Sequence, residues 1–301
     1  MNVFGLLKEA GWLFKETAIK WYERDPFRSS TVIAYYTIFS LPGLLVIIIN
    51  TAGYFFGQEQ VSQKVISQID KSIGSNAAQA VTTIIHNAGQ GESLTISSIV
   101  GLATLLFGAT GVFFQLQKSL NMVWGVEPQP KRKWLKFIID RLFSFGIILT
   151  VGFLLLVSLL LSTVLSAISA WISLRFTLPL NALFYLLDLS VSLAAITFLF
   201  AAIFKILPDA EVGWRDVWVG ALVTSLLFVI AKFSLSYYFG QSQPAWAYGA
   251  AGSIVLIMLW VSYSSMLLLF GAEFTRVYAM RRGHYVPATE IAEAVQHKRM
   301  A

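Results

Sequence analysis

Hydrophobic and polar positions alternate along this chain in blocks of about 20 residues rather than every two or four. A helix needs roughly 17 to 25 apolar residues to cross a bilayer, whereas a membrane β-strand shows alternation over only about 10 residues. Six stretches meet the helical requirement. The pattern predicts an all-α, polytopic membrane protein, a six-transmembrane-helix bundle with spans at about 31–56, 95–115, 137–161, 181–206, 217–238 and 249–271.

The segment before the first span, residues 1–30, has a helical period instead. Apolar residues recur every three or four positions from Phe4 to Trp21, and charged pairs such as Lys8-Glu9 occupy the other side. This predicts an amphipathic helix that lies along the cytoplasmic interface and stops at Asp25-Pro26. A helix packed on the protein's own cytoplasmic loops is an equally good interpretation.

The longest segment between spans, about 57–94, is polar but patterned. Apolar residues such as Val61 and Val65 stand four apart, and Gly74-Ser75-Asn76 interrupts the pattern. We expect two short helices in this outer loop. A cap over the outer mouth of the bundle and a plain surface hairpin are both compatible with them.

Basic residues predict the orientation. Of the 22 Lys and Arg residues, Lys232 falls inside a span, and only Lys64, Lys71 and Arg175 fall on the side of the 57–94 loop. Loops rich in Lys and Arg stay in the cytoplasm. We therefore expect both termini, including the tail 274–301, to be cytoplasmic.

Composition removes several kinds of chemistry. The 301 residues are 56% hydrophobic and 13% charged, which excludes a soluble domain and a disordered chain. Cysteine is absent, so disulfides, thiolate metal sites and cysteine nucleophiles are excluded. The three histidines, His86, His284 and His297, are too scattered to share a site, and no HExxH motif or P-loop is present. We expect no enzymatic activity, no metal and no cofactor.

Topology also explains the net charge of +6 better than nucleic-acid binding does. The cluster Lys131-Arg132-Lys133 beside Trp134 is typical of a cytoplasmic loop that meets anionic lipid. The expected partners are membrane lipids, with anionic headgroups at the cytoplasmic face, and no nucleic acid. A homo-oligomer stays an open alternative.

Two ionisable residues, Asp188 and Lys232, lie inside predicted spans. Such residues cost about 2.5–3.5 kcal/mol on insertion scales and mark pathways or buried pairs. Their depths below the outer ends of neighbouring spans match, at about 10 and 12 Å, so we predict a direct or water-bridged pair. The alternative places Lys232 at the outer interface by snorkelling and Asp188 in a solvated vestibule.

Three spans also carry stripes of small and polar residues, which could together line a pathway. Helix packing explains such stripes equally well. In the first span Pro42-Gly43 predicts a break that frees backbone groups for a ligand, with a static kink as the alternative. Besides Asp188, Lys232 and Pro42, the candidate pathway residues are Ser192, Ser225, Ser236, Ser253, Trp260 and Ser264.

Glu273, at the inner end of the last span, lies one turn before Arg276. Because Gly271 and Ala272 permit close helix approach there, we expect the Glu273 carboxylate to face protein and to bond to a basic group or a backbone amide.

Several motifs are more specific than hydropathy. The last span carries Tyr248-Gly249-Ala250-Ala251-Gly252-Ser253, Leu259-Trp260 and Gly271-Ala272-Glu273. Other parts of the pattern are Ala34-Tyr35-Tyr36-Thr37 with Ser40-Leu41, Leu120-Asn121-Met122-Val123-Trp124, Leu207-Pro208, Trp214-Arg215, Gly220-Ala221 and Lys232. Together they resemble the signature of the YihY/BrkB family of bacterial inner-membrane proteins, over nearly the whole chain. The resemblance implies six transmembrane helices and a location in the bacterial inner membrane.

The family has carried the names virulence-associated factor, transporter and ribonuclease BN, and it supplies no catalytic residues to transfer. A two-metal nuclease gathers several ligands around ions about 4 Å apart, which this sequence does not offer, so we reject the ribonuclease. We predict a transporter or translocator of an unidentified, lipid-like or amphiphilic substrate. A non-transporting envelope scaffold or virulence-associated factor is the alternative.

Overall fold

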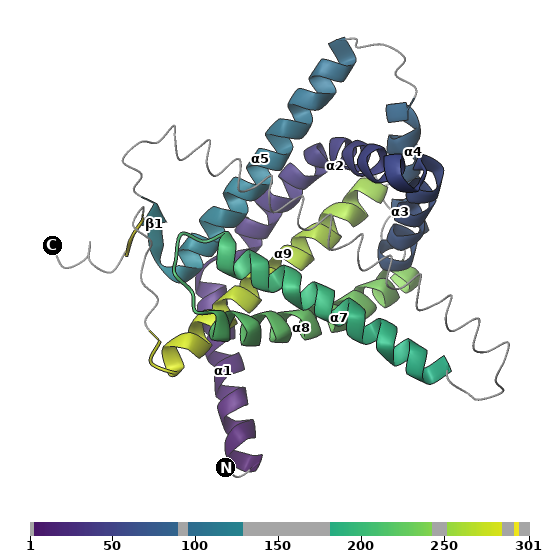
Figure 1. Ribbon diagram of the computed structural model, residues 1–301. Coiled ribbons are helices and arrows are strands. Elements are labelled where there is room, and N and C mark those ends of the chain that lie inside the picture. Colours follow the sequence, from purple (N-terminus) through teal and green to yellow (C-terminus); the bar gives the residue numbers. More distant parts are fainter. Residues whose placement is uncertain (1–2, 90–95, 129–180, 243–251, 285–291, 295–301) are drawn as a thin grey trace. The chain divides into compact units, whose positions relative to one another are not determined.

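The computed structural model describes residues 3–89, 96–128, 181–242, 252–284 and 292–294 (Figure 1). The described part is almost entirely helical, as predicted. The predicted third span, 137–161, lies outside it. The helices are α1 (Val3–Glu23), α2 (Pro26–Phe56), α3 (Gln58–Ile73), α4 (Ser75–Gly89), α5 (Ile96–Trp124), α7 (Asn181–Ile206), α8 (Trp214–Ser242) and α9 (Gly252–Arg281), and strands β1 (Val126–Pro128) and β2 (Ala292–Ala294) pair antiparallel.

Three helices of the described residues are long and apolar enough to cross a membrane. These candidate spans are Leu189–Ile206 in α7, Trp214–Leu235 in α8 and Gly252–Arg281 in α9. Helices α2 and α5 cover the ranges predicted for the first and second spans. The helical membrane class is therefore established, while the total of six spans stays a prediction.

Helix ends follow local signals where the sequence provides them. Helix α7 has the predicted bounds. Helix α2 starts at Pro26, and the side chain of its N-cap residue Asp25 accepts a hydrogen bond of 3.3 Å from the Arg28 backbone N–H. Helix α9 runs past the predicted end at Gly271, because its last turns bury Phe274 and Val277 against protein rather than lipid.

The chain divides into two compact units. Unit 1 comprises Met1–Thr17, Leu120–Leu226 and Gly271–Ala301, and unit 2 comprises Ala18–Ser119 and Leu227–Phe270. The boundaries fall inside helices α1, α5, α8 and α9.

In unit 2, helix α2 continues unbroken through Pro42, so the break predicted there is wrong. A proline ring removes one backbone hydrogen bond, but the turns on either side can hold the helix together. Helix α5 crosses α2 closely at Gly108, where an added Cβ would lie 2.7 Å from the Ser40 nitrogen. Gly108 therefore permits the close packing of the two helices.

The two short helices predicted between the first spans are confirmed as α3 and α4, separated at Gly74. Within unit 2, helix α4 packs against α9 through Ala77, which is fully buried against Leu256 and Ile257. The α3–α4 pair is therefore fixed to the start of α9 by an apolar contact.

In unit 1, helix α1 lies against two long helices. Leu13 is buried with Phe274 and Val277 of α9, and Val219 and Val223 of α8 border the same cluster. One face of α1 is thus covered by protein. Its predicted position along the membrane interface stays a prediction.

Helices α8 and α9 cross in unit 1 through a reciprocal Gly-Thr contact. Gly220 of α8 faces the Thr275 side chain, and Gly271 of α9 faces the Thr224 side chain, with no room for a Cβ at either glycine. Each threonine hydroxyl donates to a carbonyl of its own helix, Thr224 to Gly220 at 2.6 Å and Thr275 to Gly271 at 2.8 Å. The crossing therefore buries hydroxyl groups with their hydrogen bonds already made.

Candidate functional site

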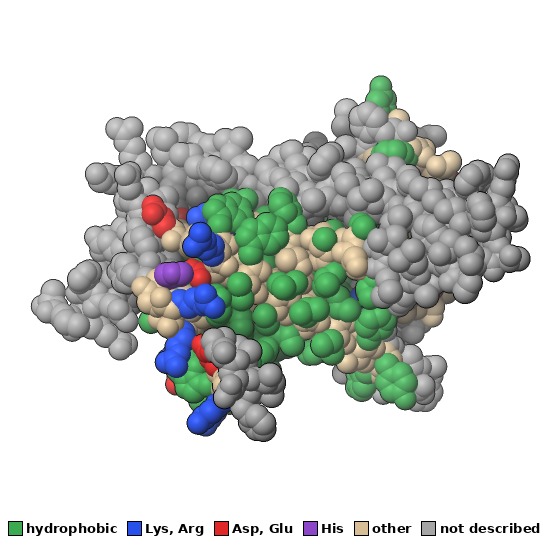
Figure 2. Space-filling model, turned by 60° about the horizontal axis from the view of Figure 1, so that its bottom comes forward, with side chains coloured by type: hydrophobic (Ala, Val, Ile, Leu, Met, Phe, Trp, Pro, Cys, Tyr) green, Lys and Arg blue, Asp and Glu red, His purple; other side chains and the backbone are tan. Residues whose placement is uncertain are grey.

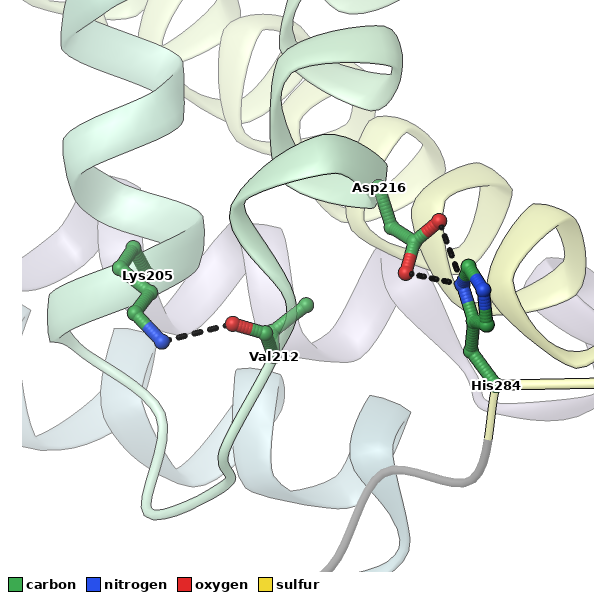
Figure 3. Close-up of polar contacts among 4 residues, drawn as sticks. All are labelled: Lys205, Val212, Asp216 and His284. Atoms are coloured by element: carbon green, nitrogen blue, oxygen red, sulfur yellow. Dashed lines mark hydrogen bonds and ion pairs between the residues drawn. The ribbon is translucent and has the colours of Figure 1, made fainter.

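The loop between α7 and α8, residues 207–213, holds the buried carboxylate of Asp209. Pro208 favours an extended residue before it, which ends α7. Asn121, at the end of α5, holds this loop by two hydrogen bonds of 2.8 Å: its amide donates to Asp209 Oδ2, and its Oδ1 accepts from the Asp209 backbone N–H. The Lys205 ammonium donates to the Val212 carbonyl at 2.7 Å (Figure 3). The loop is thus a fixed connection between two candidate spans.

A carboxylate–imidazole pair lies beside this loop (Figure 3). Asp216 stands in the first turn of α8 and is buried, whereas half of the His284 side chain is exposed. Gly283, at φ +74°, ends α9 in a turn in which the His284 backbone N–H donates to the Ala279 carbonyl at 3.0 Å. This turn brings His284 Nδ1 to 2.9 Å from Asp216 Oδ2.

Glu273 lies within α9, about two turns before that end. Its side chain is completely buried, and Oε1 lies 3.1 Å from Nη1 of Arg276, the basic partner expected from the sequence. Buried carboxylates need such partners, since an isolated charge in an apolar setting is very costly. Unit 1 therefore keeps Asp209, Asp216 and Glu273 inside, each bonded to a neighbour.

Basic side chains remain on the surface of unit 1, and three of them lie over aromatic rings. The cation-to-centroid distances are 5.8 Å for Lys205 over Trp214, 5.0 Å for Arg281 over Trp12 and 4.8 Å for Arg282 over Tyr278. We call these six residues the cation–aromatic rim. In the space-filling view, basic, acidic and histidine side chains gather in one region next to apolar side chains (Figure 2).

The predicted pathway residues divide into different environments. Ser225 is buried, lies 2.7 Å from the Thr197 hydroxyl of α7 and donates to the Leu222 carbonyl, so it joins two helices. Trp260 packs in the cluster around Ala77 and meets the Phe228 ring edge-on at 6.3 Å. The remaining described serines, Ser192, Ser253 and Ser264, are half-buried.

Of the two ionisable residues in predicted spans, the structure describes the side chain of Lys232 but not that of Asp188. Lys232 is half-buried on α8, and Pro42 is exposed on α2. The side chains of Asp188 and Ser236 lie outside the described ones, although both residues belong to helices, α7 and α8. The Asp188–Lys232 pair therefore stays a prediction.

Sequence reasoning missed the Asp216–His284 pair. The two residues are 68 positions apart and share no motif. The position of Asp216 in the first turn of α8, where the helix dipole stabilises a carboxylate, suggests a helix start but indicates no partner. Within the described ranges, no group of three or more His, Asp and Glu side chains could hold a metal ion.

The long apolar helices, the buried polar contacts between them and the basic residues at their ends define a polytopic helical membrane protein. Comparison with known proteins then gives the family. The virulence factor BrkB family matches residues 19–295, and the chain belongs to it. No solved structure matches this chain.

The relatives are bacterial proteins described as UPF0761 membrane proteins. The one from Tolumonas auensis is 28% identical over 266 residues, which cover 85% of this chain and 81% of that protein. The one from Saccharophagus degradans is 26% identical over 281 residues, covering 93% and 61%. That of Pseudomonas aeruginosa is 26% identical over 248 residues, covering 81% and 57%. The chain thus spans only about three fifths of the last two relatives.

Proposed function

We propose that this protein is an integral inner-membrane translocator of an amphiphilic, lipid-like substrate. The observation that carries the proposal is Lys232, a cation within the candidate span Trp214–Leu235. Its half-buried side chain has no hydrogen-bond or ion-pair partner among the described residues. An ionisable group at such a depth is expensive to keep and serves a pathway or a counter-charge.

The two faces of α8 support an amphiphile as the substrate. Lys232 follows the buried Ser225 by seven residues, or two helical turns, and so lies on the same polar stripe. A flanking stripe of the same helix is apolar and exposed, consisting of Leu222, Leu226, Ile230, Phe233 and Tyr237. A polar stripe beside an apolar surface suits a molecule whose headgroup needs a polar contact while its chains stay in lipid.

A non-transporting scaffold is the second candidate, and a specific observation favours it. The Thr197–Ser225 hydrogen bond and the reciprocal Gly-Thr crossing of α8 and α9 use small and polar residues for close packing. A bundle closed in this way along its whole length would leave no route for a substrate.

Reconstitution into liposomes tests the proposal. Fluorescent phospholipid analogues and a panel of small solutes are offered to the wild-type protein, with movement across the bilayer as the readout. We expect lipid movement that Lys232→Gln lowers at least about ten-fold, which matches the loss of one charged contact of roughly 1.4 kcal/mol, and that Lys232→Arg retains.

Ser234→Ala is the matched control, since Ser234 is exposed on the same helix and its hydroxyl donates only to the Ile230 carbonyl among the described contacts. This variant should move lipid at the wild-type rate. If well-folded wild-type protein moves no class of molecule, the translocator is wrong and the scaffold is favoured.

A further inference from the structure

The cation–aromatic rim lies at the ends of all three candidate spans. Trp214 begins the span in α8, Arg281 ends the span in α9, and Lys205 is one residue from the end of the span in α7. Lipid phosphates lie where membrane helices leave the hydrocarbon region, and Trp, Tyr, Lys and Arg gather there. The rim is therefore at the depth of headgroups by its position along each helix.

The buried acidic residues that the structure describes in unit 1 have partners of their own. Asp209, Asp216 and Glu273 are buried and bonded to Asn121, His284 and Arg276. Among the described residues of unit 1, the exposed acids are Glu9, Glu127 and Glu211, against the exposed bases Lys8, Lys15, Arg215, Arg281 and Arg282. The surface at these span ends is accordingly basic.

Arg281 and Arg282 are held in place yet free to bind. Each guanidinium lies over a ring, and neither has a carboxylate partner among the described residues. A ring contacts the flat face of a guanidinium, which leaves the N–H groups at its edge for bidentate bonds to phosphate oxygens. Holding the side chains in advance lowers the entropy lost on binding.

His284 completes the segment Arg281-Arg282-Gly283-His284. Asp216 contacts Nδ1, which leaves Nε2 of the half-exposed ring available (Figure 3). The buried carboxylate orients the imidazole, whose Nε2 can donate to an anion when both ring nitrogens carry protons. Asp216 is thus a positioning residue for a third polar group next to the two guanidinium groups.

We propose that residues Arg281 to His284, with the rings of Trp12 and Tyr278, form a binding site for the phosphate headgroup of an anionic phospholipid. The site recognises lipid already in the bilayer, because its residues stand at the end of a membrane span. The proposal does not depend on translocation, since a scaffold could bind the same lipid.

Spin-labelled lipids test this site in the full-length protein in vesicles. The fraction of motionally restricted label reports the relative association of phosphatidylglycerol and phosphatidylcholine. We expect the wild-type protein to associate preferentially with phosphatidylglycerol. In the double variant Arg281→Gln/Arg282→Gln, the loss of each arginine should lower the ratio of phosphatidylglycerol to phosphatidylcholine association by about five-fold or more. Arg281→Lys/Arg282→Lys should keep most of the preference, and Asp216→Asn should lower it with little change in net phosphatidylcholine association.

Lys8→Gln/Lys15→Gln is the matched control. It removes two exposed charges from α1 in the same unit, at residues for which no ring contact is seen among the described side chains. The preference should stay within about two-fold of wild type. An equal loss in both double variants would mean that total charge alone attracts the lipid, and would overturn the site.

Two further measurements keep the test decisive if a variant fails to fold. Raising the salt concentration from about 50 to 500 mM should weaken the wild-type preference, because it screens exposed charge; an unchanged preference would contradict the proposal. Soluble glycerol phosphate at millimolar concentration should not displace the lipid. If it does, the site binds a free phosphate ester and the assignment to bilayer lipid is wrong.

Discussion

At the scale of single residues, the buried carboxylates of unit 1 are the most sensitive positions. Glu273→Ala removes one partner of a fully buried ion pair and leaves Arg276, whose side chain is largely buried, without its carboxylate. We expect a loss of about 3 kcal/mol in the free energy of unfolding, measured in mixed micelles. Glu9→Ala, at an exposed position of α1, should change stability by less than about 0.5 kcal/mol. A Glu273 variant as stable as this control would show that the pair contributes nothing.

Asp188 and Lys232 are coupled if they form the predicted intramembrane pair. Asp188→Asn and Lys232→Gln should then be non-additive in the double variant, with a coupling free energy of about 1–3 kcal/mol in unfolding measurements. Effects that simply add would refute the pair. In that case Lys232 has another role, such as a substrate contact.

Contacts between charged side chains could be predicted from the sequence where the two residues are less than one helical turn apart. Glu273 and Arg276 are three positions apart, so helical geometry alone suggests their contact. Asp216 and His284 could not be paired in this way, because a turn at Gly283 and the approach of two helices bring them together. Ser225 shows a further limit, since the sequence of a polar stripe does not reveal which of its hydroxyls also contact a neighbouring helix, as Ser225 contacts Thr197.

At the scale of helices, the crossing of α8 and α9 depends on Gly220 and Gly271. Gly271→Ala places a Cβ on the Thr224 hydroxyl and should cost about 2 kcal/mol in unfolding measurements. Thr224→Ala in the same chain removes the hydroxyl and methyl groups and should recover part of that loss, although the Cβ of residue 224 still lies 2.8 Å from the added Cβ. Gly11→Ala is the control, because an added Cβ there meets nothing within 4 Å, and it should be neutral or stabilising. A double variant no more stable than Gly271→Ala would contradict the reciprocal contact.

Hydropathy predicted the bounds of a helix best where both its lipid-facing and its buried residues are apolar. Helix α7 has the predicted bounds because Asn181 and Pro208 enclose its apolar run. Helix α9 extends further because Phe274 and Val277, which have charged neighbours in the sequence, pack against Leu13 of α1. A hydropathy average over a sequence window does not include such tertiary contacts. At Pro42 the predicted break does not occur, since a proline in a long helix removes one hydrogen bond without ending the helix.

At the scale of the whole molecule, the distribution of basic residues predicts cytoplasmic termini. The natural chain contains no cysteine, so single cysteines can be placed without background. A membrane-impermeant thiol reagent applied to intact cells should label Ser75→Cys, at the start of α4, and should not label Thr289→Cys in the tail. Labelling of Thr289→Cys but not of Ser75→Cys would reverse the topology.

The translocator proposed above requires that the polar stripe of α8 form part of a pathway rather than a closed packing surface. The most direct test is the rate at which an aqueous, charged thiosulfonate reagent modifies Lys232→Cys in membranes, compared with Ile230→Cys on the exposed apolar stripe of the same helix. We predict that Lys232→Cys reacts at least about ten times faster, because a charged reagent reaches a thiol only through water. Equal, slow modification at both positions would contradict the pathway and leave a closed bundle.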